Sequence, residues 1–288
     1  MKNILAIIGS PRKLGNCEIM AKEISRRIEE PHELKLLRLP EYDIAPCRGC
    51  YTCLFKNECV IEDDHRAAVQ AIVAADALIV VVPAYFLGPN SCLKLFTDRG
   101  LSLYPHLEKL WAKPAVAVGI AGIEGKEGYT MLGIENFLKM LFADVKMRRI
   151  AYGALPGEIF FSEKNKELAG DMARALLGEP FPDSAPCCPV CGGQTFRFLE
   201  NNQVRCMLCS NSGIMTVKNG IPEFEISTSD HELFLTLKDA LDHRDWLVGM
   251  KSRFVKHKDR LKEISLAYRK TGTWLKPSDD DAPAGGQE

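Results

Sequence analysis

The chain has 288 residues, of which 46% are hydrophobic and 26% are charged, and its formal net charge is −1. This composition can bury a core, and the near-neutral charge gives no basic field that would favour nucleic acid. No apolar run approaches the roughly 20 residues of a membrane span, and the N-terminal run has no signal-peptide pattern. We therefore expect a soluble cytoplasmic protein with one doubly wound domain and a smaller appendage.

The first predicted strand, residues 3–8, leads directly into a glycine-containing turn and then into an amphipathic helix. A strand, turn and helix in this order direct free N–H groups and a helix N-terminus at an anion. The turn GSPRKLGNC is neither G-x-G-x-x-G nor a Walker A loop. This leaves a monophosphate such as that of FMN, with an ordinary turn as the alternative. Arg12 is either a phosphate counter-ion or a solvated loop charge.

Four further strands are predicted, and they alternate with helices. The strands lie at residues 33–39, 76–82, 114–120 and 145–152, and the helices at 65–75, 91–101, 129–142 and 163–177. This alternation predicts a doubly wound parallel sheet, for which we expect the flavodoxin-like order 2-1-3-4-5. Ligands bind at the carboxyl edge of such sheets. The turn 83–89 at that edge carries Tyr85 and Phe86, which would contact a flat ring or fold back as core.

A compact loop at residues 46–64 contains four cysteines, which are Cys47, Cys50, Cys53 and Cys59. Two two-residue gaps followed by a five-residue gap suit the corners of a [4Fe–4S] cluster, whereas structural zinc more often takes two separated pairs. Cytosolic thiols stay reduced, which argues against disulfides. The pattern favours a [4Fe–4S] cluster, and zinc or an empty, redox-reactive loop are the alternatives.

A second cysteine set follows a Pro-rich stretch. Two Cys-x-x-Cys pairs fourteen residues apart, with short strand-like segments around them, predict a zinc ribbon. The candidate ligands are Cys188, Cys191, Cys206 and Cys209. A single iron is the main alternative to zinc, and Cys187 is expected to be spare, because only one of two adjacent cysteines keeps the two-residue spacing.

The predicted domains follow from these segments. They are a flavodoxin-like domain at 1–178, a linker at 179–186, the ribbon at 187–226, a helical extension at 227–276 and a disordered tail at 277–288. We interpret the basic stretch 251–262 as the solvated face of a helix that packs on a partner subunit. No catalytic acid or base stands out, and three histidines are most simply surface or cap residues, namely His65, His106 and His231.

Residues 1–177 resemble the iron–sulfur flavoproteins of the NADPH-dependent FMN reductase group, which have a flavodoxin-like fold. The resemblance rests on GSPRKLGNC after the first strand, on the cysteine motif followed by Asp63 and Asp64, and on PAYF after the third strand. It implies FMN on the carboxyl edge of the sheet. The implied contacts are Ser10, Arg12, Asn16 and Cys17 for the phosphate, and Pro83, Ala84, Tyr85, Phe86, Ala121, Gly122, Ile123 and Gly125 for the ring. Cys17 departs from the family pattern, in which Ser or Thr is usual, and a thiol is a weak donor.

FMN takes two electrons as a hydride or passes them singly, whereas a cluster passes one. Their pairing predicts electron transfer between two-electron and one-electron carriers, with NAD(P)H or ferredoxin as the expected donor. The resemblance also implies a homodimer or homotetramer. The alternatives are an NAD(P)H-dependent FMN or quinone reductase without a cluster, an electron-transfer subunit that docks to a larger complex through the ribbon and C-terminal helices, and a redox-sensing nucleic-acid binder.

Overall fold

A computed structural model describes residues 1–178, 181 and 185–275. Most of the predicted linker and the whole predicted tail therefore lie outside the described residues. The chain divides into two compact units, Met1–Arg244 and Asp245–Glu288. Among the described residues, no helix combines the length and the apolar character that crossing a membrane requires.

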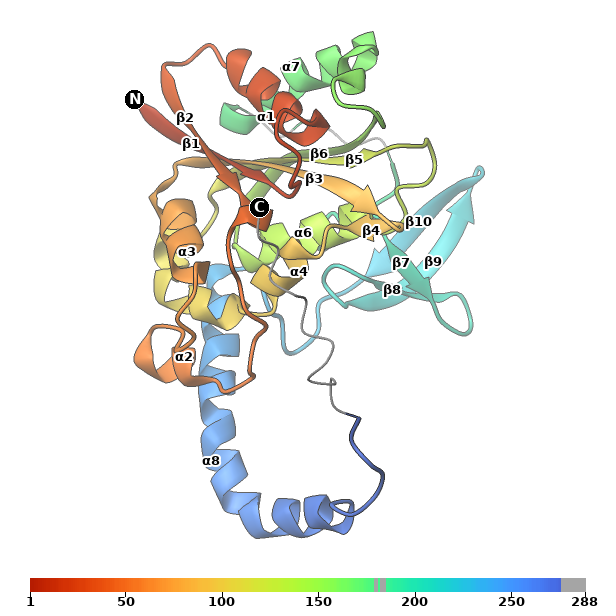
Figure 1. The fold of residues 1–288 in the computed structure, drawn as a ribbon. Coiled ribbons are helices and arrows are strands. Elements are labelled where there is room, and N and C mark those ends of the chain that lie inside the picture. The colour runs from red at the N-terminus through yellow and green to blue at the C-terminus, as the bar shows by residue number, and fades with distance from the viewer. Residues whose placement is uncertain (179–180, 182–184, 276–288) are drawn as a thin grey trace. The chain divides into compact units, whose positions relative to one another are not determined.

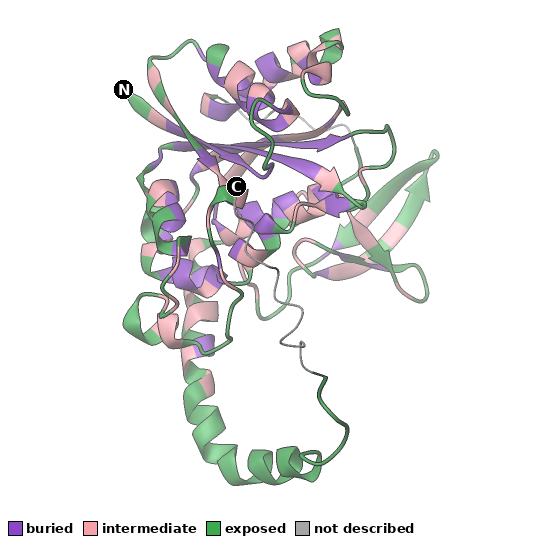
Figure 2. Cartoon of the chain, viewed as in Figure 1, coloured by how far each residue is buried: buried purple, intermediate pink, exposed green. Residues whose placement is uncertain are grey.

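Five parallel strands form the main sheet of the first unit, in the order β2-β1-β3-β5-β6 (Figure 1). Their bounds are β1 Lys2–Ile8, β2 His32–Arg38, β3 Ala77–Tyr85, β5 Pro114–Ala121 and β6 Asp144–Tyr152. Counted among the parallel strands alone, this is the order 2-1-3-4-5, so the predicted flavodoxin-like topology is confirmed. The central strands are almost continuous apolar runs because helices cover both of their faces (Figure 2).

Helices cover the two faces of the sheet (Figure 1). On one face lie α1 Asn16–Arg26 and α7 Glu163–Leu177, and on the other lie α3 His65–Ala74, α4 Cys92–Thr97 and α6 Thr130–Met140. Short helices fill the connections, namely α2 Thr52–Lys56, α5 Leu107–Leu110 and the 3₁₀ helices Leu39–Glu41, Gly100–His106 and Glu158–Phe160. The helix predicted at 91–101 thus ends at Thr97 and gives way to a 3₁₀ segment that contains Pro105.

The third strand is longer than predicted. It continues through Pro83–Tyr85 and turns back through Phe86 and Leu87 into the two-residue strand β4, Gly88–Pro89. Phe86 and Leu87 have φ angles of 48° and 67°, the geometry of a primed hairpin turn that Asn-Gly usually occupies. Bulky residues in this region carry backbone strain, which persists only where the surroundings hold it.

The ribbon is an antiparallel sheet of four strands in the order β10-β9-β8-β7. Its strands are β7 Phe196–Phe198, β8 Gln203–Cys206, β9 Ser212–Lys218 and β10 Ile221–Ile226. The last strand is not in the prediction. It pairs with β9, and its Phe224 ring stacks on the ring of Phe196 from β7, with the centroids 3.9 Å apart. The final element, α8 Leu237–Ala267, is one helix of 31 residues, and residues 251–275 in the second unit are exposed.

Candidate functional site

A buried ion pair shapes the turn between β1 and α1. Arg38, at the end of β2, donates from Nη1 to the carbonyl oxygens of Ser10 (3.1 Å) and Arg12 (2.9 Å), and from Nη2 to Glu18 (2.6 Å). Glu18 also accepts the N–H of Leu14 at 2.7 Å. Burial opposes ionisation of Glu18, but hydrogen bonds from two cationic neighbours lower its pKa to about 2. The turn is therefore held in shape by the protein itself.

The four predicted phosphate contacts have different environments. Arg12 is exposed, whereas Ser10 is buried and its Oγ accepts the N–H of Arg12 at 3.3 Å. Asn16 joins two loops, because its Nδ2 donates to Gly153 O and its Oδ1 accepts the N–H of Gly157, both at 2.9 Å. Cys17 lies in the buried core beneath the turn, and this burial raises the pKa of its thiol to about 12. Arg12 is thus the side chain of this set that is open to an incoming anion.

Large apolar side chains are exposed along the carboxyl edge of the sheet. Tyr85 and Phe86 come from the β3 hairpin, with Phe86 fully exposed, and Ile123 and Leu155 come from the loops after β5 and β6. Apolar surface gathered from several loops at one edge of an α/β sheet marks a binding surface. Of the other predicted ring contacts, Pro83 and Ala121 are buried, Ala84 is partly buried, and Gly122 and Gly125 are exposed.

The two loops predicted to contact the ring lie against each other. The N–H of Tyr129 donates to Leu87 O at 2.7 Å. A Cβ on Gly128, whose φ is 54°, would lie 2.1 Å from that same oxygen, and a Cβ on Gly88 would lie 2.4 Å from the Tyr129 ring. Glycine is therefore required at both positions for this close approach. The contact also explains how the strained turn at Phe86 and Leu87 is held.

Two aspartates fasten the base of the cysteine loop. Asp64 Oδ2 accepts the N–H of Asp43 at 2.8 Å, and Asp63 accepts the N–H groups of Ala45 (2.8 Å) and His65 (3.2 Å). The first two bonds join the segment that enters the loop to the segment that leaves it. Asp63 also accepts the N–H of the first residue of α3, so it holds both the loop and the start of this helix.

Hydrogen-bond donors surround the sulfurs of the loop. The N–H of Gly49 donates to Cys47 Sγ at 3.4 Å, and hydrogen bonds from Thr52 lower the pKa of the exposed Cys50 thiol. Burial raises the pKa of Cys53, and the remaining three thiols of the loop influence it as well. The four predicted cluster ligands thus share one loop, but among the described residues their sulfurs are not gathered as closely as those of the ribbon.

Arg99 and His65 are functional candidates that the sequence does not single out. Both side chains are almost fully buried beside the cysteine loop, which contradicts the interpretation of His65 as a surface or cap residue. Arg99 donates to Asp63 and to the carbonyl oxygen of Ala45, and it lines the same cavity as Cys59. Burial and the Arg99 charge lower the pKa of His65 to about 4, and its ring lies 4.8 Å from that of Phe96.

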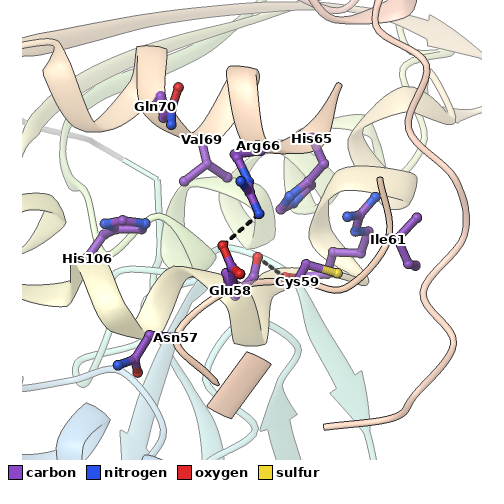
Figure 3. A pocket seen from close by; sticks show the side chains of 11 residues that line it. Asn57, Glu58, Cys59, Ile61, His65, Arg66, Val69, Gln70 and His106 are labelled. Atoms are coloured by element: carbon purple, nitrogen blue, oxygen red, sulfur yellow. Dashed lines mark hydrogen bonds and ion pairs between the residues drawn. The ribbon is translucent and has the colours of Figure 1, made fainter. Parts of the chain in front are cut away.

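These residues line a cavity of 190 Å³ between α3 and the segment 57–61 (Figure 3). Cys59 and Arg99 form part of its wall, and His106 faces it from the 3₁₀ segment. At its rim Arg66 pairs with Glu58 at 2.6 Å. The cavity thus lies directly behind one of the four loop cysteines.

The structure brings the four ribbon cysteines together. Cys191 Sγ lies 3.5 Å from Cys206 Sγ, Cys188 Sγ lies 3.9 Å from Cys209 Sγ, and all four sulfurs are within 4.8 Å of one another. Four sulfurs at ~2.3 Å from one tetrahedral ion would be ~3.8 Å apart. Cys187 is exposed. Among the described residues, this is the only group of metal-ligating side chains gathered so closely.

The two knuckles of the ribbon have the same backbone geometry. The fourth residue after the first cysteine of each pair donates its N–H to that cysteine's carbonyl oxygen, Gly192 to Cys188 at 2.8 Å and Ser210 to Cys206 at 2.9 Å. Both Gly192 and Ser210 have positive φ angles, of 75° and 63°. This matched geometry turns each pair of sulfurs toward one centre.

The sequence pattern of the NADPH-dependent FMN reductase family matches residues 2–147, just over half of the chain. The chain belongs to this family. It is accordingly an FMN-dependent oxidoreductase, and the β1–α1 turn and the exposed carboxyl edge described above are consistent with FMN.

Several curated relatives and one solved structure are similar to this family member. An iron–sulfur flavoprotein of Archaeoglobus fulgidus is 30% identical over 175 residues, which are 60% of this chain and 79% of the relative. An iron–sulfur flavoprotein of Methanocaldococcus jannaschii is 33% identical over 136 residues, 46% of this chain and 70% of that one. A structure of a flavone reductase matches 96% of this chain and 100% of its own, with a TM-score of 0.71 and 18% identity, which shows a common fold.

Proposed function

We propose that this oxidoreductase holds a [4Fe–4S] cluster on Cys47, Cys50, Cys53 and Cys59 and, with FMN, passes electrons between two-electron and one-electron carriers. The observation that carries the proposal is one short loop with four cysteines, whose two ends Asp63 and Arg99 join and in which the N–H of Gly49 donates to Cys47 Sγ. Hydrogen bonds to sulfur stabilise thiolates and cluster ligands. In a cluster each thiolate binds a different iron, whereas the four ribbon cysteines would share one ion. The sulfurs of the loop cysteines therefore need to lie farther apart than those of the ribbon cysteines. The names of the curated relatives agree with this proposal.

FMN, when bound, exchanges hydrides and single electrons. We propose that the loop from Ser10 to Cys17 binds its phosphate, with Arg12 as the cation and backbone N–H groups as donors. Tyr85 and Phe86 would flank the ring on one side and the loop from Ala121 to Gly125 on the other. In this arrangement Asn16 positions the loop after β6 instead of contacting the phosphate, because both ends of its amide already have partners.

For the ribbon we propose one zinc ion with a structural role. Closed sites of four cysteines hold zinc tetrahedrally, and the small ribbon core consists largely of the ligands themselves, Cys188 and Cys206, with Val204 and Ile226. The metal would therefore supply much of the folding free energy of this domain. The electron donor, NAD(P)H or ferredoxin, and a homodimeric or homotetrameric assembly remain predictions.

The test is the content of iron, acid-labile sulfide, zinc and FMN per chain after anaerobic purification. The wild-type protein should contain about four iron, four sulfide and one zinc, together with FMN. Cys53→Ser should lose iron and sulfide but keep zinc, and Cys206→Ser should lose zinc but keep iron. Cys187→Ser, a matched cysteine outside both sets, should lose neither. FMN without iron or sulfide in the wild type would leave a cluster-free FMN or quinone reductase.

A further inference from the structure

Arg99 joins the two ends of the cysteine loop. Its guanidinium donates to Asp63 at the end of the loop and to the carbonyl oxygen of Ala45 at its start, the latter at 3.5 Å, and it lines the same cavity wall as Cys59. The side chain is 1% exposed and that of Asp63 is 4% exposed. A buried, forked donor of this kind fixes the position of the group that it contacts.

The neighbourhood of Arg99 keeps most water away from this charge, since the side chain is 1% exposed. Its Nε is buried and has no hydrogen-bond partner, and the wall of the adjacent cavity includes Arg99 and Cys59 together. Buried charges interact more strongly than exposed ones, because little water lies between them. The effect of Arg99 on Cys59 is therefore larger than that of a surface cation at a similar place, such as Arg66.

We infer that Arg99 is a positioning residue that holds the two ends of the loop carrying Cys59 and raises the reduction potential of the cluster, and that Asp63 opposes this effect. The inference rests on the proposed function. One-electron reduction makes the thiolate-bound cluster more negative, so a buried cation beside the cluster favours the reduced form. A carboxylate beside that cation disfavours it. The structure places these two charges in one buried ion pair at the loop.

The experiment is a redox titration of the anaerobic holoprotein in which the reduced cluster is detected by electron paramagnetic resonance. Arg99→Gln removes the cation and leaves Asp63 unneutralised, so it should lower the midpoint potential. Asp63→Asn removes the opposing carboxylate and should raise it. Each change is expected to shift the one-electron equilibrium at least tenfold, which is ~59 mV. Arg99→Lys keeps the charge and should restore part of the wild-type potential. Arg66→Gln is the matched control, because it removes an exposed cation at the rim of the same cavity.

If the variants contain full iron and sulfide but keep the wild-type midpoint potential, the inference about Arg99 and Asp63 is wrong, whereas the proposed function still stands. Shifts of Arg99→Gln and Asp63→Asn in the same direction would contradict the inference as well, because a merely structural disturbance has no reason to give opposite signs. If Arg99→Gln assembles no cluster, the midpoint potentials of Arg99→Lys and Asp63→Asn test the inference instead, and wild-type values in both would overturn it. A wild-type protein without iron and sulfide would overturn both the inference and the proposed function.

Discussion

Glu18 and Arg38 show how single side chains shape the β1–α1 turn. Their ion pair is buried, with side chains 7% and 12% exposed, and between them they also satisfy one N–H and two carbonyl groups of the turn. A buried pair of this kind is costly to break, because the remaining charge keeps only its second partner, Lys22 for Glu18 or Glu41 for Arg38. The turn that is proposed to bind phosphate should therefore depend on the ionisation of Glu18.

The first prediction concerns the acid stability that Glu18 provides. Its folded-state pKa of about 2 lies below the ordinary value of 4.5, so its contribution is complete above about pH 5 and is lost as the pH falls toward 2. Between pH 7 and pH 3 the loss should be about 2 kcal/mol. Glu18→Gln should be less stable than the wild type at pH 7 and should show a flatter dependence on pH. Urea unfolding of the holoprotein at several pH values measures this.

The control for that prediction is Glu29→Gln, which changes an exposed glutamate just beyond α1. It should follow the wild-type pH dependence. Equal slopes for the wild type and Glu18→Gln would mean that the carboxyl of Glu18 titrates alike in the folded and unfolded chains, contrary to the buried geometry.

At the scale of elements, Lys113 completes a helix that has no glycine cap. Its side chain reaches from the start of β5 to the C-terminus of α3, where Nζ donates to the carbonyl oxygens of Ile72 (2.7 Å), Val73 (3.0 Å) and Ala75. The last carbonyl groups of a helix have no hydrogen-bond donor within the helix itself, so Lys113 supplies one. A cation at this end also matches the helix dipole. Helix α3, which carries His65 beside the cysteine loop, is thus tied to the central sheet.

The second prediction is that Lys113→Met destabilises the protein by about 1–3 kcal/mol, because it leaves buried carbonyl groups without donors. Hydrogen exchange should rise first at the C-terminal turn of α3. Lys109→Met, at an exposed position of α5, is the matched control and should stay near the wild-type stability. An unchanged exchange rate in α3 for Lys113→Met would show that the three hydrogen bonds contribute no stability to the helix end.

The sequence predicts the sheet correctly because local patterns determine it. Buried parallel strands are apolar runs such as Ala77–Val82, and their alternation with helices restricts the topology. The extension of β3 through Tyr85 is not local, since it needs β4 and the contact between Leu87 and Tyr129. The ribbon quartet follows from spacing, whereas the burial of Arg99 depends on a partner 36 residues away. Tertiary contacts of this kind leave no periodic signal in the chain.

At the scale of the first unit, Arg148 connects the flavin-binding sheet to the ribbon. It lies on β6, pairs with the buried Glu135 of α6, and donates from Nη2 to the carbonyl oxygen of Gly192 at 2.5 Å. Gly192 is the residue whose N–H closes the first knuckle on Cys188. The same guanidinium thus contacts both the buried Glu135 of α6 and the first knuckle of the ribbon.

The third prediction follows from this connection. The double variant Arg148→Met and Glu135→Gln removes the bond to Gly192 without leaving a buried carboxylate unpaired. Loss of one hydrogen bond of ~1 kcal/mol should loosen the first knuckle and speed the release of zinc to a chelator about fivefold. The FMN content should not change. Lys146→Met is the matched control, since Lys146 is a cation of the same strand that pairs with Asp144, also on β6. If zinc leaves the double variant and the Lys146→Met control at the wild-type rate, the ribbon holds its metal independently of the sheet. Stabilisation of the ribbon by the sheet would then not explain why the two are joined in one chain.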